Sequence, residues 1–310
     1  MSVLSRPEFH NEEAAYAYVE ARIWPHGATC PKCGERERVS KMGGKSTRIG
    51  AYKCYKCRKP FTVKVGTIFE ASHVSMCLWM QAIYLMCSSK KGISSNQLHR
   101  TLGVTLKTAW FMSHRIREAM RSDGTVNFGS GGGIVEVDET FIGHKHKKKE
   151  GARGYAHKNA ILSLVDRTTG QSKSFVVKDV TKATLLPILR ENIAKEAYVM
   201  TDEASQYQGI GAGAVFDAHG WTTHSVGEYV NREDPEMHTN TIEGFYSIFK
   251  RGMKGVYQHC DKKHLHRYAA EFEFRYNNRV ANGTNDTDRA DIALQSVIGK
   301  RLTYVQPVNN

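Results

Sequence analysis

Two Cys-X-X-Cys pairs constrain the fold of this 310-residue chain more than any other feature. Cys30 and Cys33 form the first pair, and Cys54 and Cys57 form the second. Four thiolates in two tight turns are the usual ligand set for tetrahedral structural zinc. The surrounding segment is rich in proline and glycine, which favours short strands and turns over helices. We therefore expect a small zinc ribbon over residues 25–73 that depends on its metal to fold.

The net charge of the chain indicates a polyanionic partner. Lysine and arginine number 44 against 31 aspartates and glutamates, which gives a net charge of +13. Basic side chains that neutralise phosphates release counterions, so nucleic acid is the first candidate. The sequence contains no run of 18 apolar residues and no apolar core of a signal peptide, so we expect no membrane span and a cytoplasmic location. Without a signal peptide, paired cysteines favour a metal site over disulfides.

The sequence changes character along its length, which predicts several domains. An N-terminal helix is expected within residues 1–24, ahead of the ribbon. Residues 74–121 read as consecutive helices, and residues 122–133 form a flexible linker of glycine and serine. Residues 134–310 follow the order β-β-β-α-β-α-β-α, which is a mixed α/β pattern with five strands.

Residues 93–120 are typical of a helix-turn-helix module. Ser94 or Ser95 can cap the first helix, Gly103 suits the turn, and Thr105 can cap the second helix. A second helix with a basic side can enter a DNA major groove. A plain helical connector would show the same apolar spacing. The candidate DNA contacts on the second helix are Lys107, Thr108, His114 and Arg115.

Three acidic residues are candidates for a second metal site. Asp138 lies in a strand rich in β-branched residues, Asp202 ends another strand, and Glu243 lies in a helix. Carboxylates that converge in this way can hold Mg²⁺ or Mn²⁺ for phosphoryl transfer. Each acid taken alone is more commonly a turn, cap or solvated residue. Alternatives for the first position are Glu136, which shares a strand face with Asp138, and then Glu139 and Glu203.

The helix that carries Glu243 also presents basic residues. Ser247, Lys250 and Lys254 follow Glu243 by four, seven and eleven positions and should share its helix face. A lysine beside a catalytic carboxylate is well placed to meet a DNA phosphate. Asn240, one turn earlier, can reinforce the same site.

The motifs together resemble those of the DDE transposases of bacterial insertion sequences, in the branch with an N-terminal zinc ribbon. The resemblance covers nearly the whole chain. In the ribbon it rests on WPHGATCPKCG and YKCYKCRKPFTVKVGTIFE. In the following part it rests on VEVDETFIG, VMTDEASQY, HTNTIEGFYSIFKRG and FEFRYNNR, in that order.

This resemblance implies an RNase H-like catalytic fold. It implies that Asp138 and Asp202 occupy adjacent central strands, that Glu243 comes from a following helix, and that Lys250 is the basic residue after the third acid. Some relatives carry asparagine at the third position, whereas this chain keeps glutamate. The implied partners are the inverted repeats of a mobile element, a target DNA and at least a second copy of the chain. The resemblance gives no role to residues 275–278.

The basic run HKHKKK, residues 144–149, has two interpretations. Lys147 and Lys148 can touch DNA from a hairpin tip, or the run can be a solvated surface segment. Two other functions also remain open at this point. The chain can be a DNA-binding regulator with an inactive catalytic domain, or a Mg²⁺-dependent nuclease that never rejoins strands.

Overall fold

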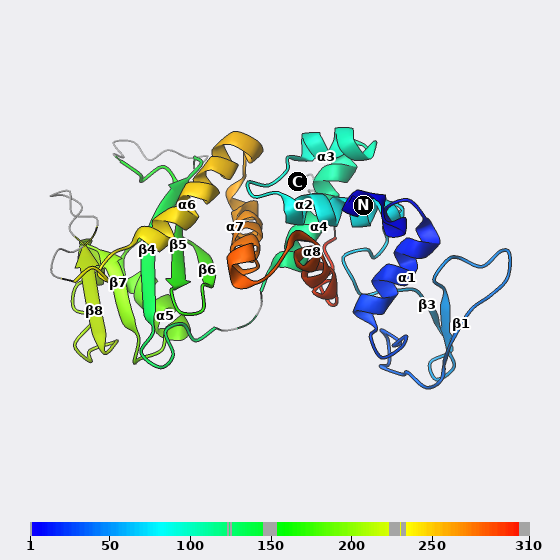
Figure 1. Cartoon of the computed structure of the whole chain (residues 1–310), viewed down its shortest axis with the longest axis horizontal. Coiled ribbons are helices and arrows are strands. Elements are labelled where there is room, and N and C mark those ends of the chain that lie inside the picture. Colours follow the sequence, from blue (N-terminus) through cyan, green and yellow to red (C-terminus); the bar gives the residue numbers. More distant parts are fainter. Residues whose placement is uncertain are drawn as a thin grey trace, which may run out of the picture. The chain divides into compact units, whose positions relative to one another are not determined.

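A mixed five-stranded sheet forms the centre of one unit of the chain, residues 121–283 (Figure 1). The computed structural model describes residues 2–122, 124, 126–144, 154–222, 230 and 234–303. The strand order is β6-β5-β4-β7-β8, with β4–β5 and β5–β6 antiparallel and β4–β7 and β7–β8 parallel. The expected mixed five-stranded sheet is therefore confirmed. The strands are β4 Ile134–Ile142, β5 Asn159–Asp166, β6 Ser172–Val177, β7 Tyr198–Asp202 and β8 Ala218–Thr222.

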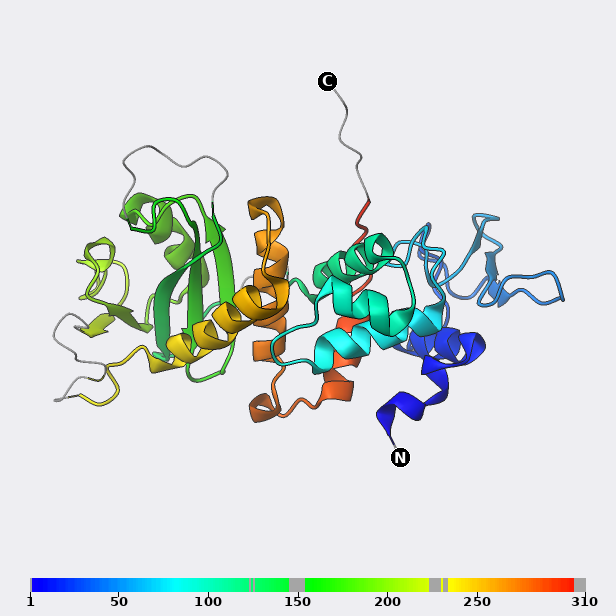
Figure 2. The same cartoon turned by 90° about the horizontal axis from the view of Figure 1, so that it is seen from above.

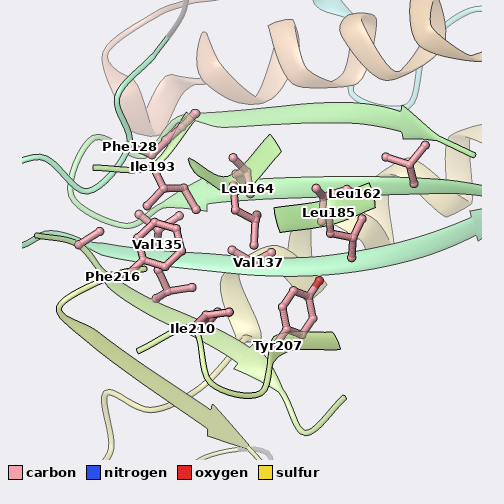
Figure 3. Packing of buried hydrophobic residues seen from close by; sticks show 14 of the residues in the cluster. Phe128, Val135, Val137, Leu162, Leu164, Leu185, Ile193, Tyr207, Ile210 and Phe216 are labelled. Atoms are coloured by element: carbon pink, nitrogen blue, oxygen red, sulfur yellow. The ribbon is translucent and has the colours of Figure 1, made fainter. Parts of the chain in front are cut away.

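Helices cover both faces of this sheet, which explains why β5 is buried along its whole length. Alternate residues of a strand point to opposite faces. Leu162 and Leu164 accordingly pack on the side of helix α5, Lys182–Asn192 (Figure 3). Ile161 and Val165 pack on the other side, against helix α6. The helices of that second face are α6 Asn240–Gly252, the π-helical turn η5 Met253–Tyr257 and α7 Lys262–Asn277; α6 is the yellow helix of Figure 2.

The segment before the sheet is not the flexible linker that its glycines predict. Phe128 is fully buried, and its backbone pairs with the chain around Ile193 (Figure 3). Gly129 has a φ of +72°, and a Cβ there would lie 2.5 Å from that of Ala197. The glycines at this point allow a close-packed turn that a larger residue would obstruct. Residues 126–133 are therefore part of the packed domain.

The connection between the fourth and fifth strands also differs from the prediction. The expected α-helix is one 3-10 turn, Ser205–Tyr207. Gly209, Gly211 and Gly213 follow it closely, and glycine disfavours helix propagation. The last strand, β8, begins at Ala218.

The other unit combines both ends of the chain, residues 1–120 and 284–310. Its small sheet is antiparallel, in the order β1-β2-β3. No helix among the described residues is long and apolar enough to span a membrane. The strands of this unit are β1 Val39–Lys41, β2 Tyr52–Cys54 and β3 Pro60–Phe61, and its helices are α1 Glu12–Ile23, α2 Met76–Ser88, α3 Ser95–Leu102, α4 Leu106–Met120 and α8 Asp286–Gln295. Short 3-10 turns lie at Val3–Ser5 and Pro7–Phe9. A further 3-10 turn, Val280–Asn282, belongs to the unit of residues 121–283.

Helix α8 corrects the predicted end of the catalytic domain, which was placed at residue 310. Asp291 of α8 accepts hydrogen bonds from the Tyr18 hydroxyl at 2.6 Å and from Arg22 Nε at 2.8 Å. Both donors belong to α1, so α8 is bound to the N-terminal helices. The segments expected as separate domains before residue 121 also form one unit with α8. These contacts join residues more than 260 positions apart, and local sequence patterns do not report them.

Candidate active site and zinc centre

The four cysteines of the ribbon come together. All four sulfur atoms lie within 4.8 Å of one another. The Sγ atoms of Cys30 and Cys57 are 3.7 Å apart, and those of Cys33 and Cys54 are 3.6 Å apart. Sulfurs at the usual zinc distance are roughly 3.8 Å apart around a tetrahedral ion. The donor set and the spacing therefore both fit structural zinc.

Asp138, Asp202 and Glu243 line one cleft of about 760 Å³. Strands β4 and β7 pair in parallel, with Glu136 opposite Met200, and the same register continued by two residues sets Asp138 beside Asp202. Glu243 enters from the first turn of α6. The remaining described residues of the lining are Tyr155, Thr239, Tyr246, Ser247 and Lys250.

One hydrogen bond holds α6 at this cleft, and a second lies within the start of the helix. The Tyr246 hydroxyl donates to the backbone oxygen of Asp138 at 2.6 Å. The Thr239 hydroxyl donates to Glu243 Oε1 at 3.3 Å and orients that carboxylate. Thr239 therefore has the supporting position that the sequence analysis gave to Asn240, which is exposed and outside the lining.

The negative charges of the carboxylates at this site repel one another. Burial, together with the negative charges of Glu139 and Asp202, raises the pKa of Asp138 to about 8, although the Glu139 N–H and the Lys250 ammonium act against this. Burial also raises the pKa of Glu139, against a 2.5 Å hydrogen bond from the Tyr207 hydroxyl. A bound divalent cation would neutralise this repulsion. Carboxylate oxygens are the ligands that Mg²⁺ and Mn²⁺ prefer, so the residues present fit such an ion.

The three alternative acids lie elsewhere. Glu136 is fully buried, outside the cleft lining, and is paired with Arg167. Glu139 lies outside the cleft lining and accepts a hydrogen bond from the Tyr207 hydroxyl. Glu203 lines an adjoining pocket of about 300 Å³. Asp138 is thus the acid of β4 that shares a cleft with Asp202 and Glu243.

The basic residues expected to meet DNA have different surroundings. Lys250 lines the cleft, with its Nζ 5.7 Å from the centre of the Tyr246 ring. Lys254 is exposed but lies outside the lining, because η5 changes the residue phase after α6. Lys147 and Lys148 fall outside the described residues.

Two exposed aromatic side chains near the acids were missed by sequence reasoning. Tyr155 is 59% exposed, lines the cleft and stacks on Phe141 with ring centres 4.6 Å apart. Trp221 is 55% exposed and lines the adjoining pocket, which also includes Asp202. Large aromatic residues are usually buried, and nothing in the local sequence marks these two as surface residues.

Helices α3 and α4 form the expected pair around a short turn. Ser94 caps α3 by accepting a hydrogen bond from the Gln97 N–H at 3.1 Å. Gly103 ends α3 with a φ of +66°. Lys107 is exposed and Thr108 is half-buried at the start of α4, where both are accessible to a partner.

His114 and Arg115 are buried, whereas the prediction placed them on a helix side that faces DNA. Their exposed fractions are 1% and 5%. Arg115 Nη1 donates to the backbone oxygens of Ile68 and Glu70 at 2.6 and 2.9 Å. The guanidinium thus fastens α4 to the end of the ribbon segment. Helical periodicity identified a polar side, but it does not distinguish a solvated arginine from one that is satisfied by buried carbonyls.

We expect Arg115→Met to lower the free energy of unfolding by about 2–4 kcal/mol, because it leaves two carbonyl groups without their donor. Methionine retains most of the apolar stem, so the loss reports the hydrogen bonds. The exposed Lys107→Ala variant should change stability by less than about 0.5 kcal/mol. Thermal or urea unfolding of the two variants measures the difference. Wild-type stability of the Arg115→Met protein would contradict a stabilising role of these two hydrogen bonds.

The segment Arg275 to Asn278 has a structural role. Asn277 Oδ1 accepts the N–H of Ser172 at 2.7 Å, and its Nδ2 donates to the Ser172 oxygen at 2.9 Å. Glu273 Oε2 accepts the next available N–H of this edge strand, from Ser174, at 2.9 Å. Arg275 is buried and paired with Glu271 within α7. Helix α7 thereby covers the β6 edge, where open backbone groups would otherwise invite another strand.

Two segments of the chain match known families. Residues 131–277 match the family described as ISXO2-like transposase domain. Residues 10–60 match the family described as transposase zinc-ribbon domain. The first match contains the three acids of the cleft, and the second contains the four cysteines.

Individual relatives agree with these families. An uncharacterized protein in transposable element ISH50 of Halobacterium salinarum is 27% identical over 282 residues, which are 86% of this chain and 91% of that protein. An uncharacterized transposase-like protein of Haemophilus influenzae is 29% identical over 103 residues, which are 33% of this chain and 78% of that protein. A chain of the simian T-cell lymphotropic virus intasome, solved in complex with PP2A regulatory subunit B56 gamma, matches with a TM-score of 0.28 and 14% identity, over 63% of this chain and 65% of that chain. A likeness at that level carries no argument about function.

Proposed function

The chain belongs to the insertion-sequence transposases that join a transposase zinc ribbon to an ISXO2-like transposase domain, and from this premise we propose that it cleaves DNA at the ends of a mobile element and joins those ends to a target DNA. The observation that carries this proposal is the shared cleft of Asp138, Asp202 and Glu243. The terminal inverted repeats are the expected ends.

The residues of the cleft have distinct tasks in this proposal. Asp138, Asp202 and Glu243 hold Mg²⁺ or Mn²⁺, and when bound these ions stabilise the attacking and leaving oxygens of an in-line displacement at phosphorus. The Lys250 ammonium meets a phosphate of the reacting strand. Thr239 keeps Glu243 turned toward the cleft. Because hydrolysis and strand joining are both displacements at phosphorus, one site serves both steps.

Other features support a DNA substrate. The exposed ring of Tyr155 lines the cleft, and that of Trp221 lines the adjoining pocket; Asp202 lines both. Aromatic rings stack on bases of single strands with little sequence preference. Lys107 and Thr108 at the start of α4 are candidates for contacting an element end, and a net charge of +13 favours phosphate binding. Since two ends must be held together, we expect the active form to be at least a dimer.

A strand-transfer assay tests this function. The full-length protein is incubated with a labelled duplex of the element end, a supercoiled plasmid and Mg²⁺ or Mn²⁺. We expect cleavage at the end, and plasmid joined to the labelled strand by its 3′-hydroxyl. Binding without cleavage would instead favour a DNA-binding regulator, and cleavage without joining would favour a nuclease.

A further inference from the structure

Glu136 joins the strand of the first acid to the helix of the third. It lies two residues before Asp138 on β4, and its side chain is fully buried. Glu136 Oε2 accepts the backbone N–H of Ile242 at 2.8 Å. Ile242 immediately precedes Glu243 in the first turn of α6. The buried carboxylate thus contacts the backbone one residue from the proposed metal ligand.

This contact replaces a missing helix cap. The first N–H groups of a helix have no partner within the helix, and the residue before the helix commonly supplies one. Thr239 holds that position in α6 but makes no capping hydrogen bond, and its hydroxyl is turned to Glu243. Glu136, which lies on strand β4, instead accepts the N–H of Ile242 in the first turn. Its negative charge also suits the positive end of the helix dipole.

Arg167 ties the same carboxylate to the chain ahead of α6. Its Nε donates to Glu136 Oε1 at 2.6 Å. Its Nη1 donates to the Glu236 oxygen at 2.7 Å, and its Nη2 donates to the His238 oxygen at 2.6 Å. The guanidinium therefore fixes both the approach to α6 and the group that caps it. Planar, multiple hydrogen bonding of this kind is specific to arginine.

We propose that Glu136 and Arg167 are positioning residues that set Glu243 at the correct distance from Asp138 for metal binding; this inference rests on the proposed function. Burying an ion pair costs desolvation energy, and apolar residues of similar size often stabilise a fold as well or better. The pair instead defines one position for the first turn of α6. Tyr246 holds the next turn of the helix to the backbone of Asp138. The spacing between the first and third acids is thus fixed at two points.

The test measures Mn²⁺ affinity by electron paramagnetic resonance on the zinc-loaded full-length protein without DNA. We expect Glu136→Gln and Arg167→Gln each to weaken Mn²⁺ binding by about 10- to 100-fold, the usual effect of losing a group that supports a metal ligand. Hydrogen exchange should become faster at the first-turn amides of α6. Cleavage by both variants should recover as Mn²⁺ is raised.

Glu273→Gln is the matched control. Glu273 is also a buried glutamate that accepts a backbone N–H, from Ser174 on the far edge of the sheet. The same chemical change there should leave Mn²⁺ affinity unchanged, whatever it does to stability. A role in stability alone would make all three variants equal in Mn²⁺ affinity once each is measured below its unfolding transition.

Several results would overturn the inference. Wild-type Mn²⁺ affinity in both Glu136→Gln and Arg167→Gln would show that the pair does not position Glu243. Loss of binding in Glu136→Gln alone, with Arg167→Gln unaffected, would make Glu136 a ligand itself. A wild-type protein that binds no Mn²⁺ would overturn the inference and the metal site together. If the wild type binds Mn²⁺ but never cleaves DNA, the proposed function fails while the affinity shifts still decide this inference.

Discussion

Asp138→Asn is expected to lower DNA strand cleavage by at least about 10³-fold while leaving the fold equally stable or more stable. Asparagine keeps the shape of the side chain but provides a weaker ligand for a hard cation. The ionised carboxylate of Asp138 opposes folding, because burial and two neighbouring acids raise its pKa from 3.8 to about 8. In metal-free protein, the free energy of unfolding should therefore fall as the pH rises from 3.8 to about 8, because over this range the folded state retains a proton that the unfolded state has lost. The neutral amide removes this cost.

Cleavage, end binding and thermal unfolding are the three measurements for this variant. Mn²⁺ should raise the melting temperature of the wild type, since a ligand of the native state stabilises it, and should raise that of Asp138→Asn much less. Binding to the element end should remain measurable. Asp217→Asn makes the same change at an exposed residue of the same domain and should behave as the wild type. Normal cleavage by the Asp138 variant, or a large fall in its metal-free stability, would contradict the assignment.

Local patterns in the sequence predicted a five-stranded sheet and marked three acids as candidates, and the family resemblance implied that the first two acids lie on adjacent strands. Strands β4 and β7 are rich in apolar residues, Asp138 lies within β4, and Asp202 is the last residue of β7. The parallel pairing of β4 with β7, whose adjacency the resemblance implied, brings Asp138 and Asp202 together. The spacing of seven residues set Lys250 on the same face of α6 as Glu243, because the helix is regular over that distance. The regularity ends at η5, so the same argument did not extend to Lys254.

Tertiary contacts account for the features that the sequence did not reveal. The local sequence suggests that Arg115 is a surface residue, but its guanidinium donates hydrogen bonds to the backbone carbonyl groups of Ile68 and Glu70. Glu136 looked like a rival metal ligand, although its partners are Arg167 and the amide of Ile242. In each case the deciding partner is distant in the sequence. Local composition reports a charge but not the group that compensates it.

Removal of zinc is expected to unfold the ribbon. Its cluster contains three fully buried residues, and two of them, Cys30 and Cys54, are candidate zinc ligands. Phe61 is the third, and the other apolar residues packed around it, such as Trp24 and Tyr52, are only partly buried, so the cluster buries little apolar area without the metal. Zinc binding to peptides of this kind contributes about 10–16 kcal/mol, and that energy is also folding energy. We therefore expect freshly purified protein to hold about one zinc per chain, and a strong chelator to release it.

Trp24 provides a specific signal for this transition. Its ring packs edge-on against Tyr52 and Phe61, with ring centres 5.5 and 5.7 Å apart. Loss of the ribbon should expose Trp24 and shift its fluorescence to longer wavelength. The Trp24→Phe variant should lose that part of the shift while releasing the same amount of zinc. This comparison separates the ribbon from the other three tryptophans of the chain.

Two cysteine variants distinguish ligands from ordinary thiols. Cys54→Ser should reduce the zinc content to well below one per chain, because serine does not replace a thiolate on zinc. Cys260→Ser changes a half-buried cysteine that is outside the four-sulfur cluster and should keep the full zinc content. A zinc content near zero in fresh wild-type protein, or a full content in Cys54→Ser, would mean that the cysteines do not hold the metal. The ribbon would then need another source of stability, because the hydrophobic cluster around the cysteines contains one buried side chain, Phe61, besides Cys30 and Cys54.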